Sequence, residues 1–375
     1  MSSQTTGIYF FIATIVCGIL GFCFLVVPVS SNPHLRHYKT SLKYLAAAYI
    51  SLALADAFFL STNQEGSFTE FLSFPNLLIA SLQSLLLTYS IITLFDYKYV
   101  STSRIKTQFT PVVLLLVLFI VANFITKDPK FPINQYFKYF HFPTVIVRTL
   151  YFLFYIYQLI YFTILFFRVE KEYDKKINDY FSETISLRMT SVRISFIGAL
   201  LVGLFSLLLH FFPTPQFNIA FIVFYTTFYL GFALVYINYN YIFNRIEPAL
   251  EYSETTLTLI PYNNPKPQWA EIKEQILSQK IYSKQGITLD EMSRLVGIER
   301  ADLSSFLAKE EEKTFSNWVN WLRIEEGKRI LKNEPNYTLI KVSSMLGFSE
   351  QSNFSKQFKL LTGCSPSVWR QGKQK

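Results

Sequence analysis

Charged residues are scarce in this chain of 375 residues. Asp, Glu, Lys and Arg make up 16% of it, well below the roughly 25% that is usual for soluble domains. The shortage is uneven, because long apolar runs broken by short polar loops fill the chain up to about residue 237, whereas the part from about residue 266 onward is charged and helix-patterned. The composition therefore argues against one soluble domain and indicates two regions with different surroundings.

Cysteine and the common catalytic patterns are also rare. The three cysteines, Cys17, Cys23 and Cys364, show no CxxC or Cys/His ligand spacing, which argues against a disulfide framework or a metal site. The chain also lacks a glycine-rich phosphate loop and a recognisable nucleophile–base set. We therefore expect no metal, no cofactor and no enzymatic activity.

What the chain does have is long apolar runs. Crossing a hydrocarbon core of about 30 Å takes about 20 mostly apolar residues in a helix. Seven runs approach or exceed that length, and the fourth, the shortest, can be extended at either end: 8–29, 42–60, 72–95, 111–126, 142–167, 194–213 and 217–237. The sequence predicts a membrane domain of seven helices over residues 1–240.

The basic residues of the loops set the expected orientation, since Lys and Arg concentrate on the cytoplasmic side. The loops after the first, third and fifth spans carry twelve of them, against three in the others: Arg36, Lys39, Lys43, Lys98, Arg104, Lys106, Arg168, Lys171, Lys175, Lys176, Arg188 and Arg193, against Lys127, Lys130 and Lys138. A cleaved signal peptide is disfavoured because no basic residue precedes the first span. We expect a bacterial cytoplasmic membrane protein with its N-terminus outside and its C-terminus in the cytoplasm.

The region after the last span begins with turn-forming residues and continues with short helices. Pro248, Pro261, Pro265 and Pro267 mark residues 241–268 as a linker. Helical patterns follow near 269–282, 288–296, 301–310, 315–333, 338–346 and 351–362. Two of the helix pairs meet at a glycine followed by an apolar residue, Gly297-Ile298 and Gly347-Phe348, and a glycine lets the chain turn sharply between two helices.

The segment from Leu339 to Arg370 carries the most specific pattern of the chain. Its spaced positions are Gly347, Phe348, Phe354, Phe358, Lys359, Gly363, Pro366 and Arg370. With them, residues 269–375 resemble the DNA-binding domain of the AraC/XylS family of bacterial transcription regulators. The resemblance implies two helix-turn-helix units joined by one long helix, here 315–333, whose apolar stripe can touch both units. It implies nothing about the seven spans, because most members of that family are soluble.

The resemblance also suggests which residues meet DNA. A helix-turn-helix places its second helix in the major groove, and in the second unit Phe354, Phe358 and Leu361 are expected to face inward. The outward set that we assign to DNA binding is Gln351, Ser352, Asn353, Ser355, Lys356 and Lys359. Gln and Asn can bond adenine, and Lys can reach guanine or phosphate. By similarity, Gln351, Ser352, Ser355 and Lys356 occupy base-reading positions.

The first helix-turn-helix unit offers weaker chemistry for reading DNA. Its candidates are Arg300, Ser304 and Ser305, beside Ala301, and an acidic run at 310–312 follows. Short side chains reach base edges poorly, and carboxylates repel phosphates. Two interpretations stay open: either the acidic run is a solvated helix end turned away from DNA, or the first unit binds weakly and specificity lies in the second.

Isolated polar residues inside membrane spans are costly and often functional. Asp56, Asn123, Arg148 and His210 each fall in the outer half of a predicted span. Asp56 and Arg148 have opposite charge at similar depth, which predicts that they pair. The four either fix helix packing or line an outward-facing pocket for a small-molecule ligand. The charged loop 168–193 is either solvated or a docking surface for the DNA-binding tail.

Together these features predict an all-α protein, a seven-helix transmembrane bundle followed by a cytoplasmic two-unit helix-turn-helix domain. The expected function is a membrane-bound bacterial transcription regulator, with double-stranded DNA and the lipid bilayer as partners. A homodimer would raise the local concentration of DNA-binding domains, and an activator would also contact RNA polymerase. The alternative is a membrane receptor or transporter whose tail is a protein-interaction module, and a third is an intramembrane enzyme with an unrecognised site.

Overall fold

The computed structural model describes residues 3–29, 35–61, 71–182, 190–212, 214–237 and 269–372. The chain divides into two compact units: Met1–Lys171 with Met189–Arg245, and Glu172–Arg188 with Ile246–Lys375. The described residues are helical apart from turns, loops and one isolated bridge, which confirms the all-α class. The expected linker, 241–268, lies outside the described residues.

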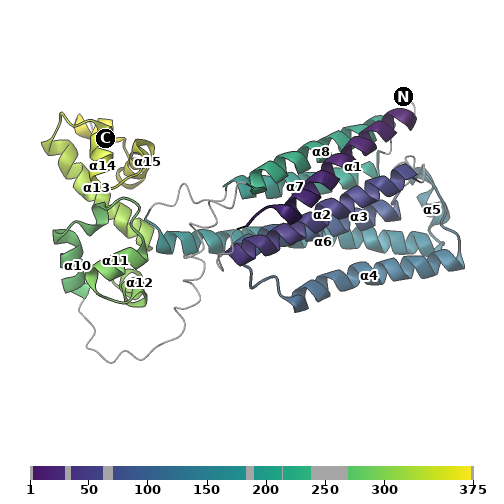
Figure 1. The fold of residues 1–375 in the computed structure, drawn as a ribbon, viewed down its shortest axis with the longest axis horizontal. Coiled ribbons are helices and arrows are strands. Elements are labelled where there is room, and N and C mark those ends of the chain that lie inside the picture. The colour runs from purple at the N-terminus through teal and green to yellow at the C-terminus, as the bar shows by residue number, and fades with distance from the viewer. Residues whose placement is uncertain are drawn as a thin grey trace. The chain divides into compact units, whose positions relative to one another are not determined.

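The described part of the chain contains seven helices long and apolar enough to cross a membrane, the number that the sequence predicts. They are α1 (Ser3–Val26), α2 (Arg36–Ser61), α3 (Phe74–Phe95), α4 (Thr102–Ile125), α6 (Pro143–Tyr180), α7 (Thr190–Leu209) and α8 (Pro215–Ile237). The two short helices η3 (Ile133–Gln135) and α5 (Tyr136–Tyr139) lie between α4 and α6 in the chain. In the first unit α2 packs between α1 and α3, and α8 contacts both α1 and α7 (Figure 1).

Two of these helices differ most from their predicted runs. The fourth begins at Thr102, well before the predicted 111, because Ser101 caps it by accepting a hydrogen bond from the Arg104 N–H, and Pro111 lies inside the helix. The fifth long helix, α6, runs on to Tyr180, beyond the predicted 167. Its last nine residues belong to the second unit.

Polar side chains join the helices of the first unit across the apolar core. The Tyr236 hydroxyl on α8 donates to the Ser90 carbonyl on α3 over 2.9 Å, and the Tyr229 hydroxyl donates to the Gln83 side chain over 2.8 Å. Ser81 donates to Gln158 over 2.7 Å. Such bonds fix helix neighbours where no water competes for the polar groups.

The outer faces of the same helices are apolar. Large side chains on them are more than two-fifths exposed, among them Ile8, Phe11, Leu54, Phe124 and Leu153. A soluble protein rarely exposes contiguous apolar surface of this extent. These faces suit a hydrocarbon environment.

The second unit is built from short helices around one long helix. They are α10 (Trp269–Ser278), η5 (Ile281–Ser283), α11 (Leu289–Val296), α12 (Arg300–Lys309), α13 (Phe315–Asn333), α14 (Leu339–Met345), α15 (Gln351–Thr362) and α16 (Pro366–Arg370). The sequence pattern did not indicate α16. The predicted stripe of α13 is buried throughout: Phe315, Trp318, Val319, Leu322, Ile330 and Leu331. It packs against α12 as well as α14 and α15, so both helix pairs share this central helix.

The stretch from Glu172 to Ser182 is an integral part of this second unit. The Ser182 carbonyl accepts hydrogen bonds from Ser316 and from Asn320 on α13, each 3.1 Å long. The Ser182 N–H donates to the Ile287 carbonyl over 3.2 Å, beside an antiparallel bridge between Phe181 and Thr288. Of the two interpretations of the 168–193 segment, residues 180–182 therefore fit the docking surface better than the solvated loop.

Candidate functional site

The pair α14–α15 is positioned by local sequence signals. Thr338 caps α14 by accepting a hydrogen bond from the Lys341 N–H. The chain then turns at Gly347, which has a φ of 81°, in the left-handed region that glycine tolerates best. Phe354 and Phe358 are fully buried and fix which face of α15 turns inward. The opposite face of α15 is therefore presented to solvent.

The six candidates on α15 lie largely on that solvent face. Gln351, Ser352, Lys356 and Lys359 are exposed, whereas Asn353 and Ser355 are half-buried. The inward position expected for Leu361 is wrong, because its side chain is 45% exposed. The neighbouring Leu360 side chain is 76% exposed. The buried stripe of α15 ends with Phe358 because the last turn of the helix extends past the core.

A buried arginine joins the second helix pair to the rest of the unit. Arg323 on α13 is fully buried; its side chain donates to the carbonyls of Tyr282 and Lys284 over 2.8 and 2.9 Å. Its guanidinium also lies 5.1 Å from the centre of the Phe348 ring. Since Phe348 follows the turn glycine of the second pair, Arg323 connects η5 to that turn.

The first pair, α11–α12, turns at Gly297, with a φ of 73°. Its strongest candidate for a DNA contact, Arg300, is engaged inside the protein, because it forms an ion pair of 2.9 Å with Asp290 on α11. The Tyr180 hydroxyl also donates to Asp290, over 2.6 Å. Ser304 and Ser305 are half-buried. The basic charge at the start of α12 is thus balanced by a carboxylate. This agrees with the interpretation that the first helix pair binds DNA weakly.

The acidic run at 310–312 is not simply a solvated helix end. Glu311 accepts hydrogen bonds from the Trp269 indole over 3.0 Å and from Lys273 over 2.6 Å. Burial raises the pKa of Glu311, but these bonds, led by that from Lys273, lower it more, so the pKa lies below its ordinary value. Glu310 and Glu312 are exposed. The middle carboxylate therefore attaches α10 to the first pair.

In the first unit, the expected pairing of Asp56 with Arg148 is wrong. Arg148 is fully buried and forms its ion pair with Asp128, at 3.0 Å. It also donates to the carbonyls of Phe71, Leu72 and Pro129. The guanidinium thus holds together the two chain segments that precede α3 and η3. Sequence reasoning missed Asp128 because it lies outside the apolar runs.

The other polar candidates are spread over the first unit. Asn123 is exposed, and its side-chain oxygen accepts a hydrogen bond from the Asp128 N–H over 3.0 Å. His210 is buried, with Nδ1 2.9 Å from the Ser206 carbonyl. Asp56 is buried as well and accepts a hydrogen bond of 3.0 Å from the Tyr225 hydroxyl. Of the four candidates, only Asp56 lines the cavity described next.

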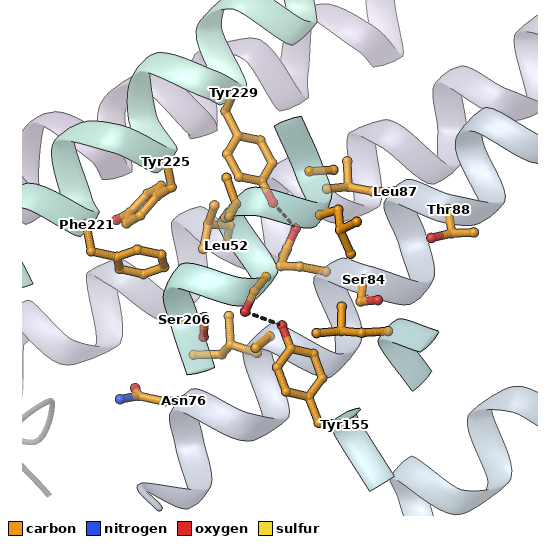
Figure 2. A pocket seen from close by; sticks show the side chains of 18 of the residues that line it. Leu52, Asn76, Ser84, Leu87, Thr88, Tyr155, Ser206, Phe221, Tyr225 and Tyr229 are labelled. Atoms are coloured by element: carbon orange, nitrogen blue, oxygen red, sulfur yellow. Dashed lines mark hydrogen bonds between the residues drawn. The ribbon is translucent and has the colours of Figure 1, made fainter. Parts of the chain in front are cut away.

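A cavity lies inside the first unit, lined by α1, α2, α3, α6, α7 and α8. Figure 2 shows Tyr155, Tyr225 and Tyr229 around it, with the hydrogen bonds from Tyr229 to Gln83 and from Tyr155 to the Gly203 carbonyl. Most of its wall is apolar. The space open to the centre of a water molecule is about 100 Å³, several times the ~10–15 Å³ that one water needs.

Comparison with known proteins bears on the second unit. The family described as "Helix-turn-helix domain" matches residues 292–372. An uncharacterized HTH-type transcriptional regulator, YobQ of Bacillus subtilis (strain 168), is 36% identical over 84 residues, which is 22% of this chain and 34% of that relative. The chain thus spans about a third of the length of the curated relative that it matches. No solved structure matches the chain.

These matches and the geometry establish a C-terminal helix-turn-helix domain, of the kind found in DNA-binding regulators of transcription. The match begins within α11 and runs through α16, so it covers both helix pairs and α13. The resemblance seen in the sequence is confirmed for this domain. The individual DNA contacts stay predictions.

Proposed function

We propose that this protein is a membrane-bound regulator of transcription, which binds specific DNA sequences with residues 269–375 while residues 1–240 cross the membrane seven times. The observation that carries the proposal is the presence, in one chain, of seven helices of membrane-spanning length and composition and a helix-turn-helix domain. The AraC-like arrangement of two helix pairs on α13 supports a single domain with two DNA-contacting helices, α12 and α15.

The charge distribution supports a tethered arrangement with both the DNA-binding domain and the basic loops in the cytoplasm. Residues 269–375 hold 17 Lys and Arg against 13 Asp and Glu, which is only moderately basic. Because phosphate contacts supply most of the affinity, a single domain of this charge binds weakly. Two copies held together in the membrane would bind more tightly through their raised effective concentration.

The two helix pairs are proposed to contribute unequally. On α15, two exposed lysines and the exposed Gln351 offer charge and base-reading amide groups, whereas Arg300 of α12 is paired with Asp290. We therefore assign sequence specificity to α15, through Gln351, Ser352, Asn353, Ser355, Lys356 and Lys359. The positions on α12, Arg300, Ser304 and Ser305, supply a weaker contact.

The test is genome-wide crosslinking of the full-length protein carrying a C-terminal tag, with a blot of the membrane fraction from the same cells. Sharp DNA peaks with all of the tag at full length in the membrane are expected. The variant with Gln351→Ala and Lys356→Ala together should lose the peaks, and Ser305→Ala should keep them.

Peaks accompanied by a short soluble tagged fragment would instead mean release of the DNA-binding domain by proteolysis. Absence of peaks under several growth conditions, with the protein present in the membrane, would contradict the proposal. That result would favour a receptor or transporter whose tail binds other proteins.

A further inference from the structure

Four polar residues of the cavity lie at one end of the helix bundle. Other polar residues also line the cavity: Gln83, Ser84, Thr88, Tyr155, Thr163 and Tyr229. Asp56 lies in the last two turns of α2, Asn76 in the first turn of α3, Ser206 in the last turn of α7 and Tyr225 in the first half of α8. Because consecutive helices run in opposite directions, these positions share the end that carries the α2–α3 and α7–α8 connections. In the proposed topology this is the outer end.

Two hydrogen-bond acceptors of the cavity wall lack donors among the described residues. The Tyr225 hydroxyl donates to Oδ2 of Asp56, and no described group bonds Oδ1. The side-chain oxygen of Asn76, which Figure 2 shows at the cavity, is buried without a hydrogen-bond partner. A buried acceptor without a donor costs about 1–3 kcal/mol, so the Asn76 oxygen favours a ligand that donates a hydrogen bond. Oδ1 of Asp56 offers such a ligand a second acceptor.

The Asp56 side chain also has no ionic partner in the described part of the chain. No described Lys, Arg or His forms an ion pair with Asp56; Arg148, the basic residue expected there, pairs with Asp128. Inside a membrane a carboxylate is usually paired with a cation, or it faces a water-filled cavity. A ligand ammonium would supply both the charge and the donors.

The rest of the wall limits the body of the ligand. It is formed mainly by apolar side chains, among them Leu52, Phe59, Leu87, Ile91, Phe162 and Phe196. Sites of this composition bind molecules that are mostly apolar, with a few polar groups to orient them. The limited space restricts the body to a few carbon atoms or one ring.

We propose that the cavity binds a small primary amine with an apolar body, whose ammonium group donates to Asp56 and Asn76 and whose body lies among the apolar side chains. Binding itself is independent of DNA. Only the further step, that the amine is the signal read by the regulator, rests on the proposed function.

The test uses the purified full-length protein in detergent and follows its thermal unfolding with n-hexylamine, cyclohexylamine or phenethylamine, each compared with the alcohol of the same skeleton. At least one amine should raise the unfolding midpoint in a saturable manner, and its alcohol should not. Asp56→Asn should lower the affinity for the amine by about tenfold or more. This factor corresponds to losing a hydrogen bond to a charged group.

Asp96→Asn is the matched control, since it makes the same chemical change at a carboxylate that does not line the cavity; it should bind as the parent does. Ser84→Leu should abolish the shift by filling the cavity while Asp56 stays in place, which tests the site if Asp56→Asn does not fold. Saturable stabilisation by none of the three amines would overturn the proposal. The proposal would also be overturned if an amine and its alcohol stabilised the protein equally. The same holds if an amine stabilised the parent and Asp56→Asn equally. The assay contains no DNA, so failure of DNA binding does not affect its outcome.

Discussion

Gly347 combines two constraints at a single residue. Its φ of 81° favours glycine, and a Cβ added there would lie 2.2 Å from the Ser283 carbonyl oxygen. That contact is to backbone, which cannot turn aside as a side chain can. The glycine of the second turn is therefore required by the neighbouring η5 as well as by the turn itself.

The substitution Gly347→Ala should strongly destabilise the helix-turn-helix domain, by more than the ~1–2 kcal/mol that the left-handed conformation alone costs a residue with a Cβ. All four tryptophans of the chain lie in residues 269–369, so their fluorescence during urea unfolding of the full-length protein reports on this unit. Gly363→Ala is the matched control, because Gly363 has a φ of 80° but, apart from its chain neighbours, no described atom lies within 4 Å of the added Cβ. Equal losses for the two variants would contradict the role given to Ser283.

Gln351 and Lys356, both exposed on α15, should affect DNA binding differently. Gln351→Ala removes a group that can bond adenine, so it should cost about 1–3 kcal/mol on the cognate sequence and little on unrelated DNA. If Lys356 contacts a phosphate, Lys356→Ala should weaken binding to the cognate sequence and to unrelated DNA alike. It should also lower the salt dependence of the binding constant by about one counterion. Titration of the purified protein with both DNAs at several salt concentrations distinguishes them. A uniform loss for Gln351→Ala would remove it from the base-reading set.

At the scale of elements, α13 carries the contacts that hold the segment ending at Ser182. Ser316→Ala together with Asn320→Ala removes both side-chain donors to the Ser182 carbonyl. Hydrogen exchange at residues 180–182 should then become faster, because the bond from the Ser182 N–H to Ile287 loses its support. Mass spectrometry of the full-length protein measures this. Asn317→Ala, an exposed position on the same helix, should leave exchange unchanged, and a similar increase there would refute the assignment.

Glu326 connects α13 to the turn before η5. It accepts hydrogen bonds from Arg329 and from Lys280, and these, led by that from Arg329, lower its pKa from 4.5 to about 2. A carboxyl whose pKa is lower in the folded state stabilises the fold above its unfolded pKa and loses that contribution as the pH falls.

Glu326→Gln should therefore be less stable than the parent near neutral pH, and the difference should disappear as the pH falls from about 4.5 to about 2. Tryptophan-monitored unfolding across this range tests the expectation. Glu325→Gln, at the exposed neighbour paired with Lys328, should show a smaller difference. A Glu326→Gln difference that does not change with pH would mean that packing, not charge, is responsible.

At the scale of the molecule, the basic loops predict which ends of the helices face the cytoplasm. Lys138, in α5, is expected outside and Lys106, in the first turns of α4, inside; both are exposed. In intact cells a membrane-impermeant maleimide should label Lys138→Cys above the background of the unsubstituted chain, and Lys106→Cys only after lysis. The reverse pattern would invert the topology and place the DNA-binding domain on the wrong side for its proposed role.

Periodicity and turn residues were enough to predict most elements. The seven apolar runs each fall on a long helix, and the second pair was located to within a residue or two by Gly347 and its flanking pattern. Errors came where a contact between distant residues decides the outcome. Asp56 and Arg148 have opposite charge at similar depth, yet they contact different partners: Asp56 bonds Tyr225 and Arg148 pairs with Asp128.

The sequence by itself determined the seven long apolar helices and the helix-turn-helix character of the last hundred residues, because these follow from local hydrophobic spacing, capping residues and glycines. Only the tertiary structure decided which polar groups meet. Glu311 is bonded by Trp269 and Lys273, and Asp56 faces a cavity without a described cation. The physical reason is that hydrogen bonds and ion pairs depend on distances of about 3 Å, which spacing along a chain does not specify.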